Sequence, residues 1–120
     1  MVSRVAVLDR LLTAWNNGDP EVVCELVTTD YQGHMLHLPS GERSAEEYAQ
    51  RIRDYRFAYP GAWFDVLDRG SSGDKVWTRL RASLPSGESA HGVNICRFVE
   101  TRIAEEWAIW SAWSLRSGTS

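Results

Sequence analysis

The first half of the chain carries hydrophobic residues at helical spacing in three places. A first apolar stripe recurs every three or four positions from about residue 5 until the Asn-Asn-Gly stop signal at 16–18. A short second stripe follows Pro20, a residue favoured in the first turn of a helix. A third begins at Ser44, which can form a capping box with Glu47. The pattern predicts three helices.

Beyond residue 61 the hydrophobic period shortens to two, which is typical of strands. Val76, Leu80 and Leu84, for example, alternate with polar or charged neighbours. Together with a strand-like segment before the third helix, the predicted strands are 31–38, 63–68, 75–84, 90–99 and 102–110. Short joints connect the last four strands, so we expect hairpins and an antiparallel, twisted sheet. The fold class is therefore α+β.

The size and composition of the chain fit a single domain over residues 1–120. Of its 120 residues 43% are hydrophobic, and they include six Trp, four Tyr and three Phe, which excludes a disordered chain. The sequence has no long uncharged apolar run, so we expect no membrane-spanning segment. A net charge of −3 disfavours a nucleic-acid partner.

The densest cluster of charges surrounds the third predicted helix. Its members are Arg43, Arg51, Arg53 and Arg56, interrupted by Glu42, Glu46, Glu47 and Asp54. Interspersed charges of both signs are typical of a solvent-exposed helix face. We therefore expect a solvated surface here.

The cysteines indicate a reducing compartment. Cys24 and Cys96 lie in different sequence settings, form no CxxC pattern and have no metal-ligand spacing. No apolar leader is present at the N-terminus. We expect reduced thiols that serve packing, in a cytoplasmic protein.

Two motifs, on this order of elements, resemble the NTF2-like superfamily and its SnoaL-like branch of polyketide cyclases and ketosteroid isomerases. The first is Asp-Tyr-Gln-Gly-His at 30–34, which is similar to the Asp-Tyr-x-x-His of that family. The second is Gly-Val-Asn-Ile-Cys-Arg-Phe at 92–98 followed by Arg-Ile-Ala-Glu-Glu-Trp at 102–107, which resembles the paired last strands of the family. The resemblance covers residues 4 to 113.

The resemblance implies a cone-shaped, cystatin-like fold. A curved antiparallel sheet would pack on three N-terminal helices around a deep apolar cavity. Relatives include ring-closing cyclases, ketosteroid isomerases and epoxide hydrolases, while others only bind ligands or partners. Two acids common in family enzymes are replaced here by Ala108 and Ser111, and the hydrogen-bonding Asp of the isomerases by Asn94.

We therefore expect a cofactor-independent cyclase or isomerase of secondary metabolism that acts by acid–base catalysis on a polyketide-like or polycyclic small molecule. Opening of an epoxide is a close variant of this chemistry. The alternative is a non-catalytic module that binds a small molecule or a partner on the same scaffold. The missing acids favour this alternative.

The three histidines, His34, His37 and His91, are candidate proton carriers near neutral pH. His34 and His37 are three residues apart on one predicted strand, so only one faces the cavity. The Asp-Tyr-x-x-His motif favours His34, whereas an epoxide-hydrolase pattern turns Tyr31 and His37 inward. His91 is expected at the surface unless its strand bulges. We expect no metal site, because neither a carboxylate nor a cysteine accompanies the histidines at ligand spacing.

Two adjacent carboxylates on the last strand, Glu105 and Glu106, must face opposite sides of the sheet. Alignment with the isomerases directs Glu106 into the cavity and Ile103, Glu105, Trp107 and Ile109 to the other face. A carboxylate beside Trp110 would have a raised pKa and could act as general acid or base. Asn94, on the neighbouring strand, could bind a developing enolate oxygen.

The remaining candidates are aromatic or apolar side chains that would surround the substrate. They are Trp15, Tyr31, Met35, Tyr48, Ile52, Tyr55, Trp63, Trp77, Phe98 and Trp110. Trp107 and Trp113 would leave apolar surface on the outer face of the sheet. A homodimer would cover that surface.

Overall fold

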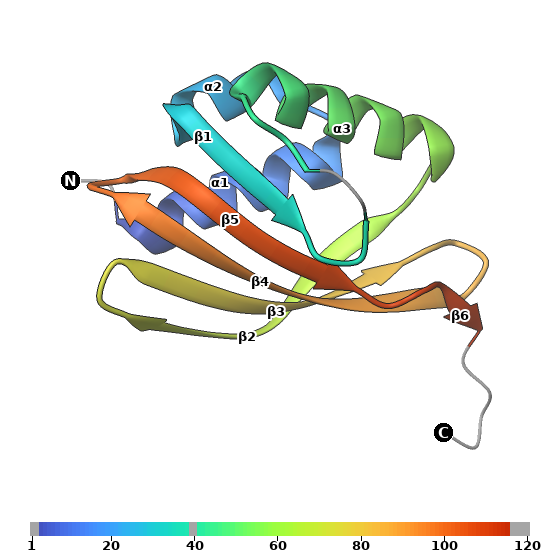
Figure 1. The fold of residues 1–120 in the computed structure, drawn as a ribbon. Coiled ribbons are helices and arrows are strands. Elements are labelled where there is room, and N and C mark those ends of the chain that lie inside the picture. Colours follow the sequence, from blue (N-terminus) through green and yellow to red (C-terminus); the bar gives the residue numbers. More distant parts are fainter. Residues whose placement is uncertain (1–2, 39–40, 116–120) are drawn as a thin grey trace.

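The computed structural model describes residues 3–38 and 41–115. Three helices, α1 (Arg4–Asn17), α2 (Val23–Leu26) and α3 (Ala45–Ala58), accompany a 3-10 turn at Pro20–Val22. The strands are β1 (Val27–Met35), β2 (Trp63–Ser72), β3 (Lys75–Ser83), β4 (Glu88–Val99), β5 (Arg102–Trp110) and the short β6 (Ser114–Leu115). The element order agrees with the sequence pattern, although β1 begins and ends earlier than expected (Figure 1).

Both long helices begin at a serine cap. The side chain of Ser3 accepts a hydrogen bond from the backbone N–H of Ala6, and that of Ser44 accepts one from Glu47. Glu47 returns a contact to the backbone N–H of Arg43, 2.9 Å away, so the helix start is held from both sides. The Ser44 cap fixes the residue at which α3 begins and hence which of its side chains point towards the sheet. α3 carries part of the site.

The sheet has the order β1-β5-β4-β3-β2, with β6 paired to β4. All pairs are antiparallel except β1 and β5, which run parallel, so the sheet is mixed. The hairpin joints predict the antiparallel pairs correctly. They carry no information about β1, which lies at the edge of the sheet next to the last long strand rather than beside its neighbour in sequence.

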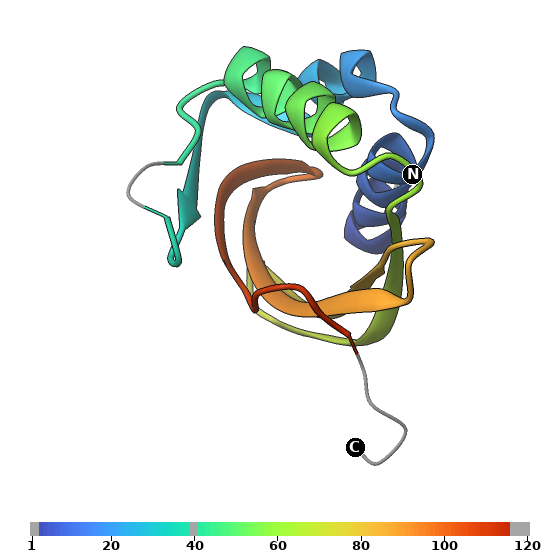
Figure 2. The ribbon, with the colours of Figure 1, turned by 90° about the vertical axis from the view of Figure 1, so that its right-hand side faces the viewer.

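Strong curvature turns the sheet into a trough. Figure 2 shows the trough end-on, with α1 and α3 over its concave side. This is the cone of the NTF2-like fold, as the motifs predict. None of the helices in the described part of the chain is long and apolar enough to cross a membrane.

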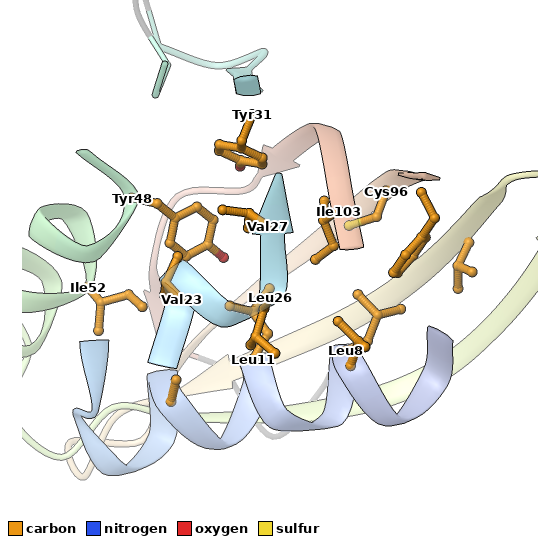
Figure 3. Close-up of a cluster of buried hydrophobic side chains, with 14 residues drawn as sticks. Leu8, Leu11, Val23, Leu26, Val27, Tyr31, Tyr48, Ile52, Cys96 and Ile103 are labelled. Carbon is orange, nitrogen blue, oxygen red and sulfur yellow. The ribbon is translucent and has the colours of Figure 1, made fainter. Parts of the chain in front are cut away.

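The core fills one end of this trough. Side chains from all three helices meet the inner faces of β1, β3, β4 and β5 (Figure 3). The members are Val7, Leu8, Leu11, Ala14, Val23, Leu26, Val27, Tyr31, Tyr48, Ile52, Val76, Cys96, Phe98 and Ile103. Leu8, Leu11 and Tyr48 belong both to this core and to the lining of a cavity that adjoins it.

A bulge between β4 and β5 corrects one expectation about the last strand. The pairing shifts after Arg97, so Phe98 lies opposite Ile103 while Arg97 lies opposite Glu105. Ile103 and Ala104 are therefore both buried, although strict alternation places Ile103 on the outer face. From Ala104 onward the alternation is regular.

Candidate active site

The cavity that adjoins the core has a volume of about 760 Å³. Its walls come from α1, α3 and the concave face of the sheet, and they are mostly aromatic or aliphatic. Trp15, Tyr55 and Phe64 form one aromatic cluster, with ring centroids 5.4–5.5 Å apart, and Phe64 in turn contacts Trp110 at 5.7 Å. A cavity of this size and lining fits a small apolar molecule with few polar groups.

Glu106 is the one carboxylate of β5 that faces this cavity, and it is 5% exposed. Its strand neighbours on the same face, Ala104 and Ala108, are small and leave it room. The phenol of Tyr31 donates a hydrogen bond to Glu106 Oε1 over 3.1 Å. Gly33 lies opposite Glu106, and a Cβ there would come within 2.7 Å of this phenol oxygen. The glycine thus makes space for the Tyr31–Glu106 contact.

Burial raises the pKa of Glu106 above its ordinary value. The positive charge of Arg51 opposes this shift and the negative charge of Glu42 adds to it. Hydrogen bonds from Tyr31 and Asn94 oppose it further. A carboxyl group with a raised pKa can both accept and return a proton nearer to neutral pH, which is the property a general acid–base needs.

Tyr48 also lines the cavity, and its side chain is almost fully buried. Its oxygen accepts a hydrogen bond from the indole N–H of Trp15 at 2.9 Å. Within residues 3–38 and 41–115 no acceptor is recorded for the Tyr48 O–H itself. Burial, followed by the charge of Glu106, raises the pKa of this phenol, so it keeps its proton. Tyr48 is therefore an oriented donor beside the carboxylate.

Arg51 and Glu42 line the cavity, so the expectation of a solvated surface is wrong for these two residues. The exposed members of the cluster agree with it: Arg43, Glu46, Glu47, Arg53 and Asp54. Arg51 Nε donates to Glu42 Oε1 over 2.7 Å, and its guanidinium lies 4.9 Å from the ring of Trp15 and 4.8 Å from that of Tyr48. Glu42 is 5% exposed. Pairing and aromatic stacking offset the cost of burying Glu42 and most of the Arg51 side chain, which is 26% exposed. Helical spacing could have indicated this placement. Arg51 lies three residues after Tyr48 and four before Tyr55, so the three side chains share one face of the helix.

Asn94 projects from β4 into the cavity, beside Glu106. Its direct cross-strand partners are Thr78 and Ala108. The amide makes a hydrogen bond that lowers the pKa of Glu106, while its carbonyl oxygen Oδ1 is buried without a partner. The sequence-based placement of Asn94 next to the carboxylate agrees with this geometry.

His34 and His37 point to opposite sides of the sheet, as their spacing of three residues requires. His37 lines the cavity near its mouth, where its Nδ1 accepts from the backbone N–H of Trp110 at 3.3 Å. His34 faces the opposite side, stacks on Trp107 at 5.5 Å and lies 2.7 Å from Glu105 Oε2. The inward pair is therefore Tyr31 and His37, and the alternative that favours His34 is wrong. His91 is exposed.

Glu105 also lies outside the cavity. Besides His34 it contacts Arg97, whose Nη2 lies 3.2 Å from Oε1. The hydrogen bond from His34 lowers the pKa of Glu105. The two adjacent carboxylates of β5 thus have opposite surroundings and opposite pKa shifts, as alternation along a strand allows.

The predicted substrate-binding residues divide into three groups. Those that line the cavity are Trp15, Met35, Tyr48, Tyr55 and Trp110. Those packed in the core beneath it are Tyr31, Ile52 and Phe98. Those on the outside are Trp63 and Trp77, which are 51% and 41% exposed. Trp77 alternates with the buried Val76 and Thr78, so its strand turns it outward to cover Gly70.

Further cavity residues escaped the sequence analysis. Phe64, Tyr59 and Trp113 also line the cavity, and Trp113 contacts Tyr59 at 5.3 Å instead of lying on the outer face. Arg69 reaches in from β2. Within residues 3–38 and 41–115 no three His, Cys, Asp or Glu side chains cluster as a metal site would need.

The curved mixed sheet, with helices over its concave face and a mostly apolar cavity between them, is the architecture of the NTF2-like fold. The family model of the SnoaL-like domain matches residues 8–106. The chain belongs to this SnoaL-like family. No curated protein sequence matches the chain.

Several solved structures share the fold. IdmH from Streptomyces antibioticus, to which a polyketide cyclase activity is ascribed, is 25% identical with a TM-score of 0.75 over 91% of this chain and 92% of its own. A protein of Bacillus cereus ATCC 10987 with the same ascribed activity is 21% identical, with a TM-score of 0.80 over 90% and 74%. A SnoaL-like protein from Agrobacterium tumefaciens str. C58, with an ascribed isomerase activity, is 18% identical, with a TM-score of 0.77 over 93% and 100%. The last two likenesses show the fold alone.

Proposed function

We propose that this chain is a cofactor-independent cyclase or isomerase that moves a proton at a carbon next to a carbonyl group. The observation that carries the proposal is Glu106, a buried carboxylate with a raised pKa on the wall of a cavity whose lining is mostly aromatic or aliphatic. The polyketide cyclase activity ascribed to IdmH supports a polyketide-like or polycyclic substrate.

In the proposed reaction, ionised Glu106 removes the α-proton of a bound ketone. The electron pair of the broken C–H bond moves onto the carbonyl oxygen and gives an enolate. The O–H of Tyr48 stabilises this oxygen, and Trp15 holds Tyr48 in place. The enolate carbon then attacks a second carbonyl of the same molecule, whose oxygen takes the electron pair of its C=O bond and receives the proton from Glu106. Alternatively, where the ketone is unsaturated, Glu106 returns the proton to the far carbon of the conjugated dienolate. The first outcome closes a ring and the second isomerises the substrate.

Tyr31 holds the carboxylate of Glu106 in place. Its phenol donates a hydrogen bond to Oε1 over 3.1 Å. Burial raises the pKa of Tyr31, followed by the charge of Glu106, and the phenol stays a donor. We infer that Tyr31 is a positioning residue that fixes the rotamer of the base.

His37 would bind the far end of the substrate. Because its Nδ1 accepts from the backbone N–H of Trp110, a neutral ring carries its proton on Nε2. Trp110 follows Glu106 by four residues, which is roughly 13 Å along a strand. A molecule of two or three fused rings spans such a distance, with one oxygen at each end.

The experiment is exchange of α-protons in D₂O, followed by proton NMR with 1-tetralone as the probe ketone. The protein is expected to accelerate loss of the signal from the carbon next to the carbonyl. Binding of 1-tetralone without any exchange would contradict the proposal. That outcome would support the binding-module alternative, which the presence of Ala108 and Ser111 at acid positions favours.

Replacing Arg51 with Met is expected to shift the rising limb of the pH–rate profile to higher pH, by roughly one unit. Arg51 lowers the pKa of Glu106, so without its charge the carboxylate forms only at higher pH. The same exchange assay over a pH series measures the shift. Arg53→Met is the control, since Arg53 pairs at the surface with Glu21. A limb that stays in place in Arg51→Met would contradict the electrostatic role.

We also propose that two copies of the chain associate through the outer face of the sheet. Trp77, Ile95 and Trp107 form a row across β3, β4 and β5, and the next row carries Val93 and Ile109. Four of these side chains are 39–48% exposed. Ion pairs of both signs flank the rows, between Arg97 and Glu105 and between Arg79 and Asp68. An apolar patch edged by both charges can pair with its own copy.

Ile95→Glu is expected to convert such a dimer into a monomer of 13.6 kDa, because it puts a charge in the middle of the patch. Light scattering after gel filtration measures the mass. Val5→Glu, at a 44% exposed site on α1, is the matched control and should keep the dimer. A monomeric wild type would contradict the association.

A further inference from the structure

One buried atom in the cavity wall has a hydrogen-bonding capacity that the protein does not use. Within residues 3–38 and 41–115, only Arg81 Nε and Asn94 Oδ1 are buried side-chain polar atoms without a partner. Arg81 is on the outer face of the sheet, where its Nη2 lies 3.8 Å from Asp65. Asn94 lines the cavity. A buried acceptor without a donor is costly, so native proteins rarely leave one unsatisfied unless a ligand or water supplies the donor.

The surroundings of Asn94 fix which end of its amide is free. Its NH₂ group is the end that can donate to the carboxylate of Glu106, a contact that helps to lower the pKa of that group. The carbonyl end therefore points away from Glu106. On the neighbouring strand the hydroxyl oxygen of Thr78 accepts from Arg69 Nε over 3.3 Å. Neither neighbour supplies a donor to Oδ1.

The donor that Asn94 Oδ1 lacks has to suit the ketone chemistry proposed for Glu106. Arg51 and Arg69 line the cavity together with the carboxylates of Glu42, Glu47, Asp54 and Glu106, so the choice of donor rests on that chemistry and not on charge. A neutral O–H fits, either an alcohol, a phenol or the enol form of a β-dicarbonyl. Because Asn94 and Glu106 are neighbours, this O–H would lie close to the carbon that loses its proton.

We propose that the cavity selects substrates with a hydroxyl or enol group, which donates its O–H to Asn94 Oδ1 beside the reacting carbon. This deepens the proposed function and rests on it for the role of Glu106. Asn94 Oδ1 thereby accepts a hydrogen bond from the substrate, whereas a group that binds an enolate oxygen would have to donate one. Tyr48 remains the donor to the carbonyl oxygen, so the two groups recognise the two oxygens of a hydroxy ketone or an enolised diketone.

Calorimetric titration with three probes tests the selection without turnover. The probes are 2-naphthol, naphthalene and 2-methoxynaphthalene, which share the ring system while only the first carries an O–H. The wild type is expected to bind 2-naphthol at least about tenfold more tightly than either of the others, as a hydrogen bond to a buried orphan acceptor implies. Equal affinities for all three in the wild type would overturn the proposal, whatever the variants do.

Two variants assign the preference to Asn94. Asn94→Leu keeps the volume but loses the acceptor, so the affinities for 2-naphthol and naphthalene should become equal. Asn94→Ala gives a second reading should the leucine disturb the fold. Glu105→Gln, on the other face of β5 and outside the cavity, should keep the preference. A preference that persists in both Asn94 variants would overturn the assignment.

The outcome is separable from the exchange experiment with 1-tetralone. Selective naphthol binding by a protein that exchanges no α-protons would retain the hydroxyl subsite and reject the acid–base function. Exchange of α-protons without selectivity for 2-naphthol would retain the acid–base function and reject the hydroxyl subsite.

Discussion

Glu106→Gln is expected to reduce the rate of α-proton exchange by about 10²–10⁴-fold, the usual contribution of a general acid–base. Glutamine has the shape of the carboxyl group, and its Oε1 can still accept the hydrogen bond from Tyr31. It cannot accept a proton. Affinity for 1-tetralone should therefore change little while exchange is lost, and NMR measures both quantities on the same samples.

Glu105→Gln is the matched control, because it makes the same chemical change one residue away on the other face of β5. Glu105 contacts His34 and Arg97 outside the cavity, so its replacement should leave exchange unaltered. His34→Ala should be equally silent. Loss of exchange in Glu105→Gln, with Glu106→Gln active, would mean that the facing of β5 is reversed.

Ile103→Ala is expected to lower the free energy of unfolding by about 2–5 kcal/mol, the range for truncating a large aliphatic residue in a core. Ile103 is 1% exposed and packs in the core because of the bulge between β4 and β5. Strict alternation places it on the outer face, where truncation costs little. Urea unfolding monitored by circular dichroism distinguishes the two placements.

Ile109→Ala is the internal comparison on the same strand. Ile109 is 48% exposed, and its truncation should change stability by only about 0.5 kcal/mol in an isolated chain. Where the sheet face is covered by a second copy, the loss in Ile109→Ala should depend on protein concentration, whereas that in Ile103→Ala should not. Equal losses for both substitutions at every concentration would contradict the bulge.

The element order and the fold class could be predicted because they rest on local signals. The Ser44 cap, the period of α3 and the hairpin joints act within a few residues of each other. The parallel pairing of β1 with β5 joins segments some seventy residues apart in sequence, as in the register of His34 with Trp107. No local pattern encodes that pairing, so the mixed character of the sheet was missed.

The site was partly predictable for the same reason. Regular alternation from Ala104 to Trp110 puts Glu105 and Glu106 on opposite faces of the sheet, and the resemblance to the isomerases indicates that Glu106 is the inner one. Alternation fails at Ile103 because a bulge inserts one residue. Arg51 was missed because a charged residue on a helix is by default predicted to be exposed to solvent. Only its contacts with Glu42 and two aromatic rings in the folded structure explain why most of its side chain is buried.

The most direct test of the account is the titration of the two neighbouring carboxyl groups, by ¹³C NMR of protein labelled at the glutamate carboxyl carbons. Glu106→Gln and Glu105→Gln assign the two signals by their loss. The account predicts that Glu106 titrates above the ordinary value of 4.5 and Glu105 below it, because the first is buried in the cavity and the second is hydrogen-bonded to His34. A Glu106 carboxyl that titrates at or below 4.5 would contradict the buried acid–base on which the proposed function depends.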